Sequence, residues 1–350
     1  MSKKTINGIW LTHGIGDVVM SIPALKDSIS NDNEYYLFVN SPMQKSIINY
    51  FINGKQLNFI IKSKSKFLFY LKLFSTRFNN FYFVHGNRGY LKDLILYFLR
   101  SKCKIIPKSN SNYLNSSKYI YISNENLHKV NYYRSFFHLD LINEYPIRFN
   151  FNQKKNSRIN ILISPGSGDL EKHKRWKISE WNKLIFKLNK ENKFNIHIIY
   201  TENEKCIYDN LDKKLDLIPF KPNSIIETMD YIKEIDFAIS VCNGTSHICS
   251  IMGKPVFAMY GPTNPFYTGV FGKKHYIFRK LHSCNHNSFK IPPYYCLGCY
   301  SNNIDYNDPI CMNGIDEKEV YTQLTNFISY SFNLNLSNSK GQISIKNKND

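Results

Sequence analysis

The segment with the greatest capacity for chemistry runs from Ser164 to Trp176 and reads SPGSGDLEKHKRW. It follows the apolar run Ile159–Ile163, which has the length and composition of a buried strand. Its small residues and its basic residues are expected to lead into a helix that Trp181 and Leu184 anchor. Backbone N–H groups at a helix start, with cations beside them, form a site for phosphate. We therefore predict that Ser167, Gly168 and Lys174 bind a diphosphate, with Lys174 neutralising its charge as it leaves.

A second motif, HGIGD, lies directly after the apolar run Ile6–Leu11. Gly14 and Gly16 allow a sharp turn and let a ligand approach the backbone. Asp17 then falls at the start of a helix, where aspartate is also favoured as an ordinary cap. A carboxylate that faces a cleft can instead take the proton from a hydroxyl that attacks a sugar. The motif is compatible with both roles, and the second makes Asp17 the candidate general base.

Two further motifs follow strand-like runs in the second half of the chain. CNGTSH begins at Cys242, and small polar residues at a helix start suit phosphate or sugar hydroxyls. His247 could equally be a buried core histidine. YGPTNP begins at Tyr260, where two prolines and a glycine indicate a rigid turn. The first of these motifs supplies the predicted donor-binding residues Asn243, Gly244, Thr245, Ser246 and His247.

Of the eight cysteines, four lie close together in the sequence. Their inner pair has C-x-x-C spacing, which can hold a metal on two thiolates, and the outer pair could complete a tetrahedral site. Zinc is the first choice and iron the second, while a redox pair and free thiols are alternatives. The predicted ligands are Cys284, Cys296, Cys299 and Cys311.

Strand-like and helix-like segments alternate along almost the whole chain, which is typical of parallel α/β sheets. The polar stretch Asn143–Ser157 is the best linker candidate. We predict a first domain over residues 1–150 and a second over 151–332, with a cysteine-rich insert at 284–311. Residues 333–350 are rich in Asn, Ser and Lys, and we expect a disordered polar tail there.

The composition is that of a globular protein, with 43% hydrophobic residues among 350. No apolar run approaches the roughly 18 residues that span a bilayer, and the N-terminus does not resemble a secretory signal. These features favour a cytoplasmic location. The formal net charge of +19 favours polyanionic partners, such as phosphorylated sugars, nucleic acid or an anionic membrane face.

Taken in order, these motifs resemble glycosyltransferase family 9, the ADP-heptose:lipopolysaccharide heptosyltransferase family. The resemblance runs from about Ile6 to Phe327 and includes HGNRG at His85–Gly89 and CMNGI at Cys311–Ile315. It implies an α/β chain of GT-B type, with two Rossmann-like domains facing one another across a cleft. The N-terminal domain would hold the acceptor, with Gly14, Gly16, Asn87 and Arg88 on that side.

The resemblance also implies roles for single residues. Asp17 would be the catalytic base, and the Ser167 region and Lys174 would bind the donor's phosphates. Glu204 is placed like a family residue near the nucleoside, although Glu202 competes for that position. Family members usually carry Asp where this chain has Cys242, so a carboxylate that would bind sugar hydroxyls is missing.

The function that follows is inverting transfer of a sugar, most simply heptose from ADP-heptose, to a lipopolysaccharide core or related glycan. The partners are a nucleotide-sugar and a phosphorylated glycolipid at the inner face of the membrane, without nucleic acid and without a cofactor for catalysis. One alternative is an O-heptosyltransferase that acts on autotransporter-type proteins. Others are a basic zinc-module protein that binds nucleic acid and a sugar-nucleotide sensor without catalysis.

Overall fold

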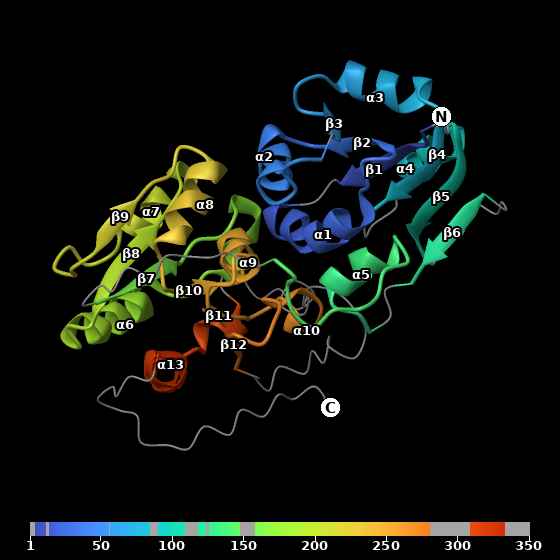
Figure 1. The fold of residues 1–350 in the computed structure, drawn as a ribbon. Coiled ribbons are helices and arrows are strands. Elements are labelled where there is room, and N and C mark those ends of the chain that lie inside the picture. Colours follow the sequence, from blue (N-terminus) through green and yellow to red (C-terminus); the bar gives the residue numbers. More distant parts are fainter. Residues whose placement is uncertain are drawn as a thin grey trace. The chain divides into compact units, whose positions relative to one another are not determined.

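The computed structural model describes residues 4–11, 14–55, 57–84, 90–108, 118–123, 126–147, 158–280 and 309–332. The chain divides into two compact units (Figure 1). The first comprises residues 1–147 with 224–228, and the second comprises residues 148–223 with 229–350.

The described part of the first unit contains a six-stranded parallel sheet with the order β3-β2-β1-β4-β5-β6 (Figure 1). Its strands are β1 (Ile6–Leu11), β2 (Glu34–Val39), β3 (Leu57–Ile61), β4 (Phe78–Phe83), β5 (Ser101–Pro107) and β6 (Tyr119–Ile122). Its helices are α1 (Ile15–Ser28), α2 (Pro42–Phe51), α3 (Lys66–Ser75), α4 (Tyr90–Phe98) and α5 (Lys129–Ser135).

Apolar side chains fix the helices of the first unit against the sheet. Phe69 and Leu73 of α3 share one buried cluster with Leu96 of α4 and with the sheet residues Phe38 and Phe81. Because strands alternate their side chains between faces, this cluster places α3 and α4 on the same side of the sheet. Helix α1 instead contacts α2 and α5.

The described part of the second unit contains another six-stranded parallel sheet, with the order β12-β11-β10-β7-β8-β9. Its strands are β7 (Ile159–Ser164), β8 (Phe194–Ile199), β9 (Ile218–Phe220), β10 (Phe237–Val241), β11 (Val256–Met259) and β12 (His275–Phe278). Its helices are η1 (Asp169–Lys174), α6 (Ile178–Lys190), η2 (Glu202–Glu204), α7 (Lys205–Asp209), α9 (Gly244–Ile251), α10 (Pro265–Thr268), α12 (Ile310–Asn313) and α13 (Glu317–Phe332). Helix α8 (Ile225–Lys233) begins within residues 224–228 of the first unit and ends in the second.

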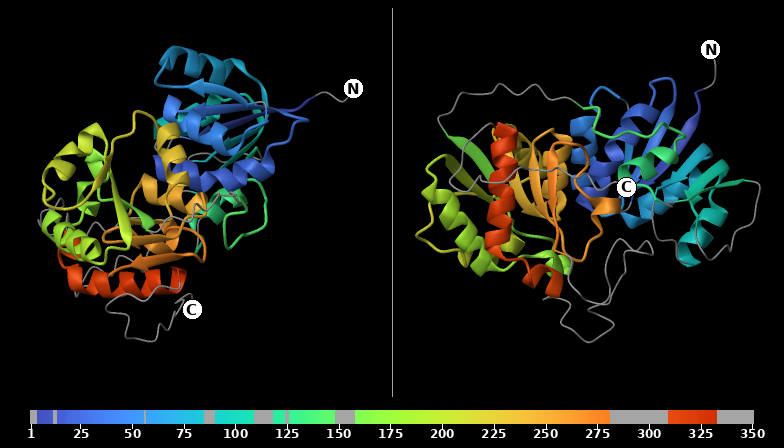
Figure 2. Two further views of the ribbon diagram at one scale, coloured as in Figure 1. Left: turned by 60° about the vertical axis from the view of Figure 1, so that its left-hand side comes forward. Right: turned by 90° about the horizontal axis from the view of Figure 1, so that it is seen from below.

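Helix α6 shows how the sequence pattern produces the fold of the second unit. Its apolar residues recur at helical spacing, so that Trp181, Leu184, Ile185 and Leu188 all lie on the buried face. Helix α13 packs beside α6 and against β12, as Figure 2 shows along the edge of this unit. The closing helix of the chain therefore completes the core that α6 begins.

Most of the expected elements are confirmed. Apolar runs predict strands over Ile6–Leu11, Leu57–Ile61 and Phe237–Val241, and the structure has strands with these bounds. The sequence predicts a final amphipathic helix from Asp316, and this helix begins at Glu317. The short strands β9 and β12 were not predicted. Each is bounded by polar or charged residues and lacks a clear alternation of apolar side chains.

Val130, Tyr133, Phe137 and Leu141 recur at helical spacing and predict a helix over Asn126–Ile142. This prediction is wrong in length. Helix α5 ends at Ser135, and His138 then adopts a positive φ of 54° that reverses the chain. The buried side chain of Arg134 stabilises this reversal, because its Nε donates to the carbonyl of Asp140 at 2.6 Å. Leu141, expected on the buried helix face, is exposed.

A partly buried histidine, His275, makes stability depend on pH. Burial lowers the pKa of His275 to about 4, and its Nε2 lies 3.0 Å from Ser250 Oγ and 3.1 Å from the carbonyl oxygen of Phe271. The unfolded chain binds the proton more readily, so stability is present above pH 6.5 and declines as the pH falls toward 4. We expect the free energy of unfolding to fall by about 3 kcal/mol at pH 4 through this group alone.

The measurement is denaturant unfolding at several pH values for the wild type and His275→Gln. The variant should lose less stability than the wild type between pH 7 and pH 4. Burial also lowers the pKa of His173 to about 4, so part of the dependence should persist in the variant. Parallel pH curves for the two proteins would show that His275 is not the source.

In the described part of the chain, no helix is both long enough and apolar enough to cross a membrane. The predicted cysteine-rich insert, except residues 309–311, and the predicted polar tail lie outside the described residues.

Candidate active site

In the second sheet, the order in which the chain adds strands reverses at β7. Strands β8 and β9 extend from one side of β7, and β10, β11 and β12 extend from the other. In parallel sheets, ligands bind beyond the carboxyl ends of the strands at such a switch point. Strand β10 pairs directly with β7, with Ser240 opposite Ser164, so the loops that follow these two strands lie side by side.

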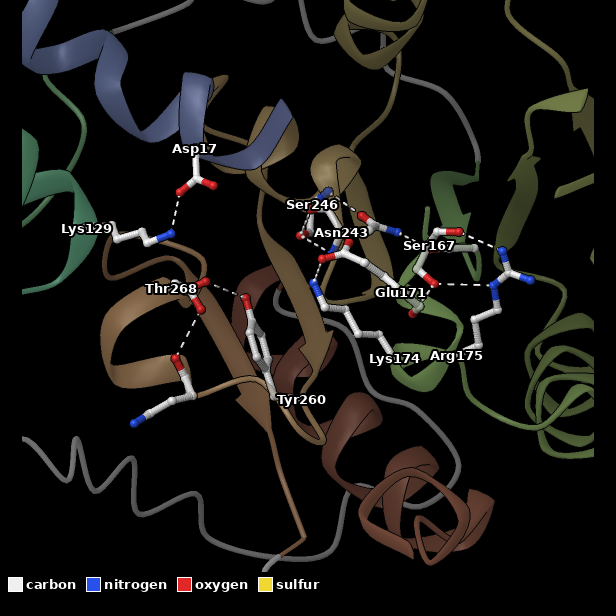
Figure 3. A network of polar contacts seen from close by, with 12 residues as sticks. Asp17, Lys129, Ser167, Glu171, Lys174, Arg175, Asn243, Ser246, Tyr260 and Thr268 are labelled. Atoms are coloured by element: carbon white, nitrogen blue, oxygen red, sulfur yellow. Dashed lines mark hydrogen bonds and ion pairs between the residues drawn. The ribbon is translucent and has the colours of Figure 1, made fainter. Parts of the chain in front are cut away.

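Asn243 ties these two loops together (Figure 3). Its amide nitrogen donates to the Ser164 side chain at 2.9 Å and to the Gly166 carbonyl at 2.8 Å. Its amide oxygen accepts from the backbone N–H of Ser246 at 2.9 Å and so caps α9. Asn243 was predicted from the sequence to bind the donor. In the structure, its side chain holds the loop that begins at Ser164 against the CNGTSH loop.

The loop after β7 leads into helix α6, as predicted. Helix α6 begins at Ile178, and Trp181 and Leu184 lie on its buried face. Between the glycines and α6, the residues after Gly168 form the short 3-10 helix η1, which was not predicted. The loop is closed by Arg175, whose guanidinium donates to the Ser167 carbonyl at 2.7 Å and approaches Ser167 Oγ at 3.3 Å.

Two further bonds organise the basic part of this loop (Figure 3). Ser167 Oγ donates to the Glu171 carbonyl at 2.8 Å, and Lys174 Nζ lies 2.6 Å from Glu171 Oε1. The side chain of Lys174 is 7% exposed, whereas that of Glu171 is 37% exposed. Lys174 is therefore a largely buried cation whose position an anionic neighbour fixes.

Cys242, at the end of β10, lies close to Lys174. Burial raises the pKa of the Cys242 thiol, and the positive charge of Lys174 acts in the opposite direction. The raised pKa keeps this thiol neutral near pH 7. The chain therefore has a small neutral thiol beside Lys174. A carboxylate at this position would instead attract the ammonium group of Lys174.

Glu204 lies against Gly166 in the loop that follows β7, and therefore belongs to the same part of the second unit as Ser167. A Cβ added to Gly166 would overlap the Glu204 carboxyl group, so only glycine allows this close approach. Glu204 Oε2 accepts from the backbone N–H of Thr201 at 3.1 Å and from Thr201 Oγ1 at 2.9 Å. Glu202, the competing candidate, instead pairs with Lys221 at the surface.

The other residues of the CNGTSH motif open helix α9. Gly244 is its first residue, and Asn243 and Ser246 form a reciprocal capping box. Ser246 is fully buried, and its Oγ donates to the Asn243 carbonyl at 2.7 Å. His247 is also buried, while Thr245 is partly exposed. Of these four residues, Gly244 and Thr245 are thus the more accessible to a ligand.

The YGPTNP turn follows β11, next to β10 in the sheet, and is buried from Tyr260 to Asn264. Asn264 caps α10 by accepting from the backbone N–H of Phe266 at 3.0 Å. Thr268 Oγ1 donates to the Asn264 carbonyl, and the Tyr260 hydroxyl donates to the Thr268 carbonyl (Figure 3). The predicted rigid turn is confirmed, and it borders the CNGTSH loop.

In the first unit, Asp17 lies in the first turn of α1 and makes two contacts with α5, of which Figure 3 shows the one to Lys129. Its Oδ1 lies 2.5 Å from Lys129 Nζ and accepts from the Tyr133 hydroxyl at 2.8 Å. The Asp17 side chain is 20% exposed. Gly14, which precedes α1 as its N-cap, is exposed, and Gly16 is partly exposed.

No role was predicted for Lys129 or Tyr133, because their contact with Asp17 spans more than a hundred residues. Arg175 was noted only as a basic neighbour of the first loop, and nothing in the motif indicated that it folds back onto Ser167. An alignment of relatives could reveal such pairs, whereas a single sequence offers no signal for them.

Several predicted site residues lie outside the described part of the chain, namely Asn87, Arg88, Cys284, Cys296 and Cys299. Cys311 is described, and it is partly exposed. Within the residues that the structure describes, no cluster of three or more His, Cys, Asp or Glu could hold a metal ion. The predicted four-cysteine site therefore stays a prediction.

Comparison with known proteins shows a family to which part of this chain is similar. Residues 130–294 match the model of glycosyltransferase family 9 (heptosyltransferase). A search of curated protein sequences found no match.

Solved structures of similar fold cover nearly the whole chain. A family 9 glycosyltransferase from Veillonella parvula has a TM-score of 0.68 at 13% identity, covering 95% of this chain and 99% of its own. The Escherichia coli ADP-heptose lipopolysaccharide heptosyltransferase II has a TM-score of 0.67 at 12% identity, covering 93% and 99%. The iron-containing dodecameric glycosyltransferase TibC from enterotoxigenic E. coli has a TM-score of 0.59 at 13% identity, covering 94% and 77%.

At these identities the structural likeness establishes the fold, which is α/β of GT-B type as predicted. The match of residues 130–294 confirms the family resemblance inferred from the motifs.

Proposed function

We propose that this chain acts as a glycosyltransferase of family 9, whose model its residues 130–294 match, and we propose its donor, its acceptor class and its base. In this proposal it transfers heptose from ADP-heptose to a lipopolysaccharide core or a related surface glycan, with inversion at the anomeric carbon. The donor choice is supported by the fold, which heptosyltransferase II of E. coli shares.

The observation that carries the proposal is the linkage of loops at the switch point of the second sheet. Asn243 joins the loop that contains Ser167 to the N-terminus of α9, and Lys174 lies buried beside them. We assign the donor diphosphate to Ser167, Gly168 and Lys174. We assign the donor sugar to the start of α9, at Gly244, Thr245, Ser246 and His247, with Asn243 holding the loops, and the nucleoside to Glu204.

Asp17 is the proposed base. Its carboxylate takes the proton of the acceptor hydroxyl while that oxygen attacks the anomeric carbon from the face opposite the diphosphate. The bond between the anomeric carbon and the diphosphate oxygen breaks, and both electrons leave with the diphosphate. Lys129 and Tyr133 position the carboxylate.

The buried ammonium of Lys174 and backbone dipoles stabilise the negative charge that develops on the departing diphosphate. The reaction as proposed therefore requires no cofactor. A zinc or iron ion on Cys284, Cys296, Cys299 and Cys311 would be structural in this scheme.

The acceptor is proposed to be a phosphorylated glycolipid at the inner face of the membrane. The net charge of +19 favours such an anionic acceptor. Gly14 and Gly16 border Asp17 on the acceptor side. Asn87 and Arg88 belong to the segment that follows β4, the strand paired with β1. The protein would work from the cytoplasm, with no nucleic acid among its partners.

Replacing Glu204 with Ala tests the nucleoside assignment. We expect the KM for the nucleotide-sugar to rise about tenfold with kcat little changed, because one hydrogen bond to a charged group is lost in binding. Steady-state kinetics with varied donor provides the measurement. Glu202→Ala is the matched control, since Glu202 lies two residues away and pairs with Lys221 at the surface. A larger effect of Glu202→Ala than of Glu204→Ala would reverse the assignment.

The function itself is tested by mass spectrometry of products. The protein is incubated with heptose-deficient lipopolysaccharide core and with ADP-heptose, UDP-sugars or GDP-sugars in parallel. The proposal predicts a mass increase of one heptose with ADP-heptose only. Transfer from a UDP- or GDP-sugar would refute the donor, and heptose appearing only on an added protein would refute the acceptor.

A further inference from the structure

Helix α3 is apolar on both of its sides. Phe69 and Leu73 are buried against the sheet, as in any helix that covers a core. On the outer side, however, Phe67 is 74% exposed, and Leu68 and Leu71 are also exposed. Helices with apolar residues all round are normally buried. A hollow along this helix is lined by Lys66, Phe67, Tyr70, Leu71, Phe74 and Ser75.

Helix α4 repeats the pattern on the same face of the sheet. Leu96 and Leu99 reach the cluster that Phe69 and Leu73 occupy. Its outer side exposes Leu91, Leu94, Tyr97 and Phe98. Two neighbouring helices thus present leucine and aromatic side chains to the surroundings, which marks an interaction site rather than isolated surface residues. We call the exposed residues Phe67, Leu68, Leu71, Leu91, Leu94, Tyr97 and Phe98 the apolar face.

The charges around the apolar face have one sign. From Lys62 to Arg100, the stretch that contains α3 and α4, the sequence has eight lysines and arginines and one acidic residue, Asp93, which is buried. The exposed cations Lys64 and Lys66 lie at the start of α3, and Arg77 and Arg100 follow the two helices. Burial lowers the pKa of Lys92 on α4, and the nearby charge of Lys62 lowers it further. Cations therefore crowd together on this side of the unit.

We propose that the apolar face docks the enzyme on an anionic lipid bilayer. Leucine, phenylalanine and tyrosine side chains would enter the interfacial layer, and the surrounding lysines and arginines would contact lipid phosphates. This combination fits a membrane surface, where apolar and anionic groups occur within a few ångströms of each other.

Two other occupants fit less well. A second copy of the chain, placed symmetrically on the same face, would bring the same lysines together and repel itself. Nucleic acid would be bound by the cations, but leucines on outward helix faces offer no surface for base stacking.

The experiment is flotation with vesicles of phosphatidylcholine alone and of phosphatidylcholine with phosphatidylglycerol, without any sugar donor. The wild type should float with the anionic vesicles and lose binding at high salt. Phe67→Ser combined with Leu91→Ser should weaken binding about a hundredfold, since each inserted side chain contributes about tenfold. The matched control is Phe186→Ser with Tyr330→Ser, which removes two exposed aromatic side chains from the second unit and should leave binding unchanged.

A second pair of variants separates charge from apolar contact. Lys64→Glu with Lys66→Glu should reduce binding to anionic vesicles by at least about 25-fold, because each lysine near such a surface contributes about fivefold. Lys213→Glu with Lys214→Glu changes two exposed lysines of the second unit and should have a much smaller effect. Equal losses in both pairs, or no binding of the wild type, would overturn the proposal. So would a change from dimer to monomer in Phe67→Ser/Leu91→Ser by analytical ultracentrifugation, with vesicle binding unaltered.

This inference deepens the proposed function, because it gives the enzyme a route to a membrane-bound acceptor. Its test is distinguishable from that of the transfer reaction. The Phe67→Ser/Leu91→Ser variant should retain full turnover on a short, lipid-free acceptor and lose turnover only on acceptor embedded in vesicles. Vesicle binding without transfer would refute the proposed reaction and leave the docking face in place.

Discussion

Replacing Asp17 with Asn should reduce kcat by about a thousandfold, while the affinity for ADP stays within a few-fold of the wild type. A positioned general base typically contributes about a hundredfold to ten-thousandfold, and asparagine keeps the shape of the side chain without its basicity. The measurement combines the rate of heptose transfer with calorimetric titration of ADP. Because Asp17 Oδ1 contacts Lys129 and Tyr133, the unfolding temperature must be measured as well.

Asp27→Asn is the matched control for this variant. Asp27 lies near the end of the same helix α1 and also pairs with a basic residue of α5, Arg134. Both substitutions therefore remove one ion pair between α1 and α5, but only Asp17 is proposed to touch the acceptor. A comparable loss of kcat in the two variants would assign the effect to the helix contact, and full activity of Asp17→Asn would exclude the base.

Replacing Lys174 with Met should lower kcat/KM by about a hundredfold to a thousandfold. The size follows from the loss of one charged group aimed at the place where negative charge develops. Methionine keeps most of the buried volume, since the Lys174 side chain is only 7% exposed. The effect should be largest with the intact donor and smaller on the binding of adenosine, which lacks the diphosphate.

Lys172→Met is the control for Lys174→Met, because Lys172 lies two residues away and is exposed. It removes the same formal charge from the same loop, and we expect less than about a threefold change from a surface cation in screened solvent. If Lys172→Met were the more damaging of the two, the loop's general charge rather than the placed ammonium would bind the diphosphate.

The sequence predicted the fold well because both sheets are built from short apolar runs with clear ends. Ile159–Ile163 was recognised as a strand since it stands between polar residues and a glycine-rich turn. Helix α5, which ends at Ser135, was predicted too long because the apolar spacing continues to Leu141. The positive φ of His138 and the Arg134–Asp140 contact, which end that helix, depend on tertiary structure.

The site was predictable where its residues lie together in one motif. The residues after β7 and β10 were found because small polar residues and glycines follow buried strands in each case. Their connection through Asn243 was not predicted, because it depends on which strands are neighbours in the sheet. The same holds for Lys129 and Tyr133, which reach Asp17 from a helix more than a hundred residues away.

The apolar face was also beyond sequence reasoning. The run Phe67–Phe74 predicts a helix but does not say which of its apolar residues lie inward. Only the packing of Phe69 and Leu73 into the sheet shows that Phe67, Leu68 and Leu71 are left outside. Amphipathic patterns reveal one buried side, and a helix that is apolar on both sides gives no such contrast.

The central claim is that a nucleotide-sugar diphosphate binds at the loops that Asn243 joins in the second unit. A crystal structure of the protein with ADP-heptose, or with ADP, tests it most directly. The account predicts diphosphate oxygens within hydrogen-bonding distance of Lys174 and of the backbone at Ser167 and Gly168. A diphosphate bound elsewhere, with these groups in contact only with water, would contradict it.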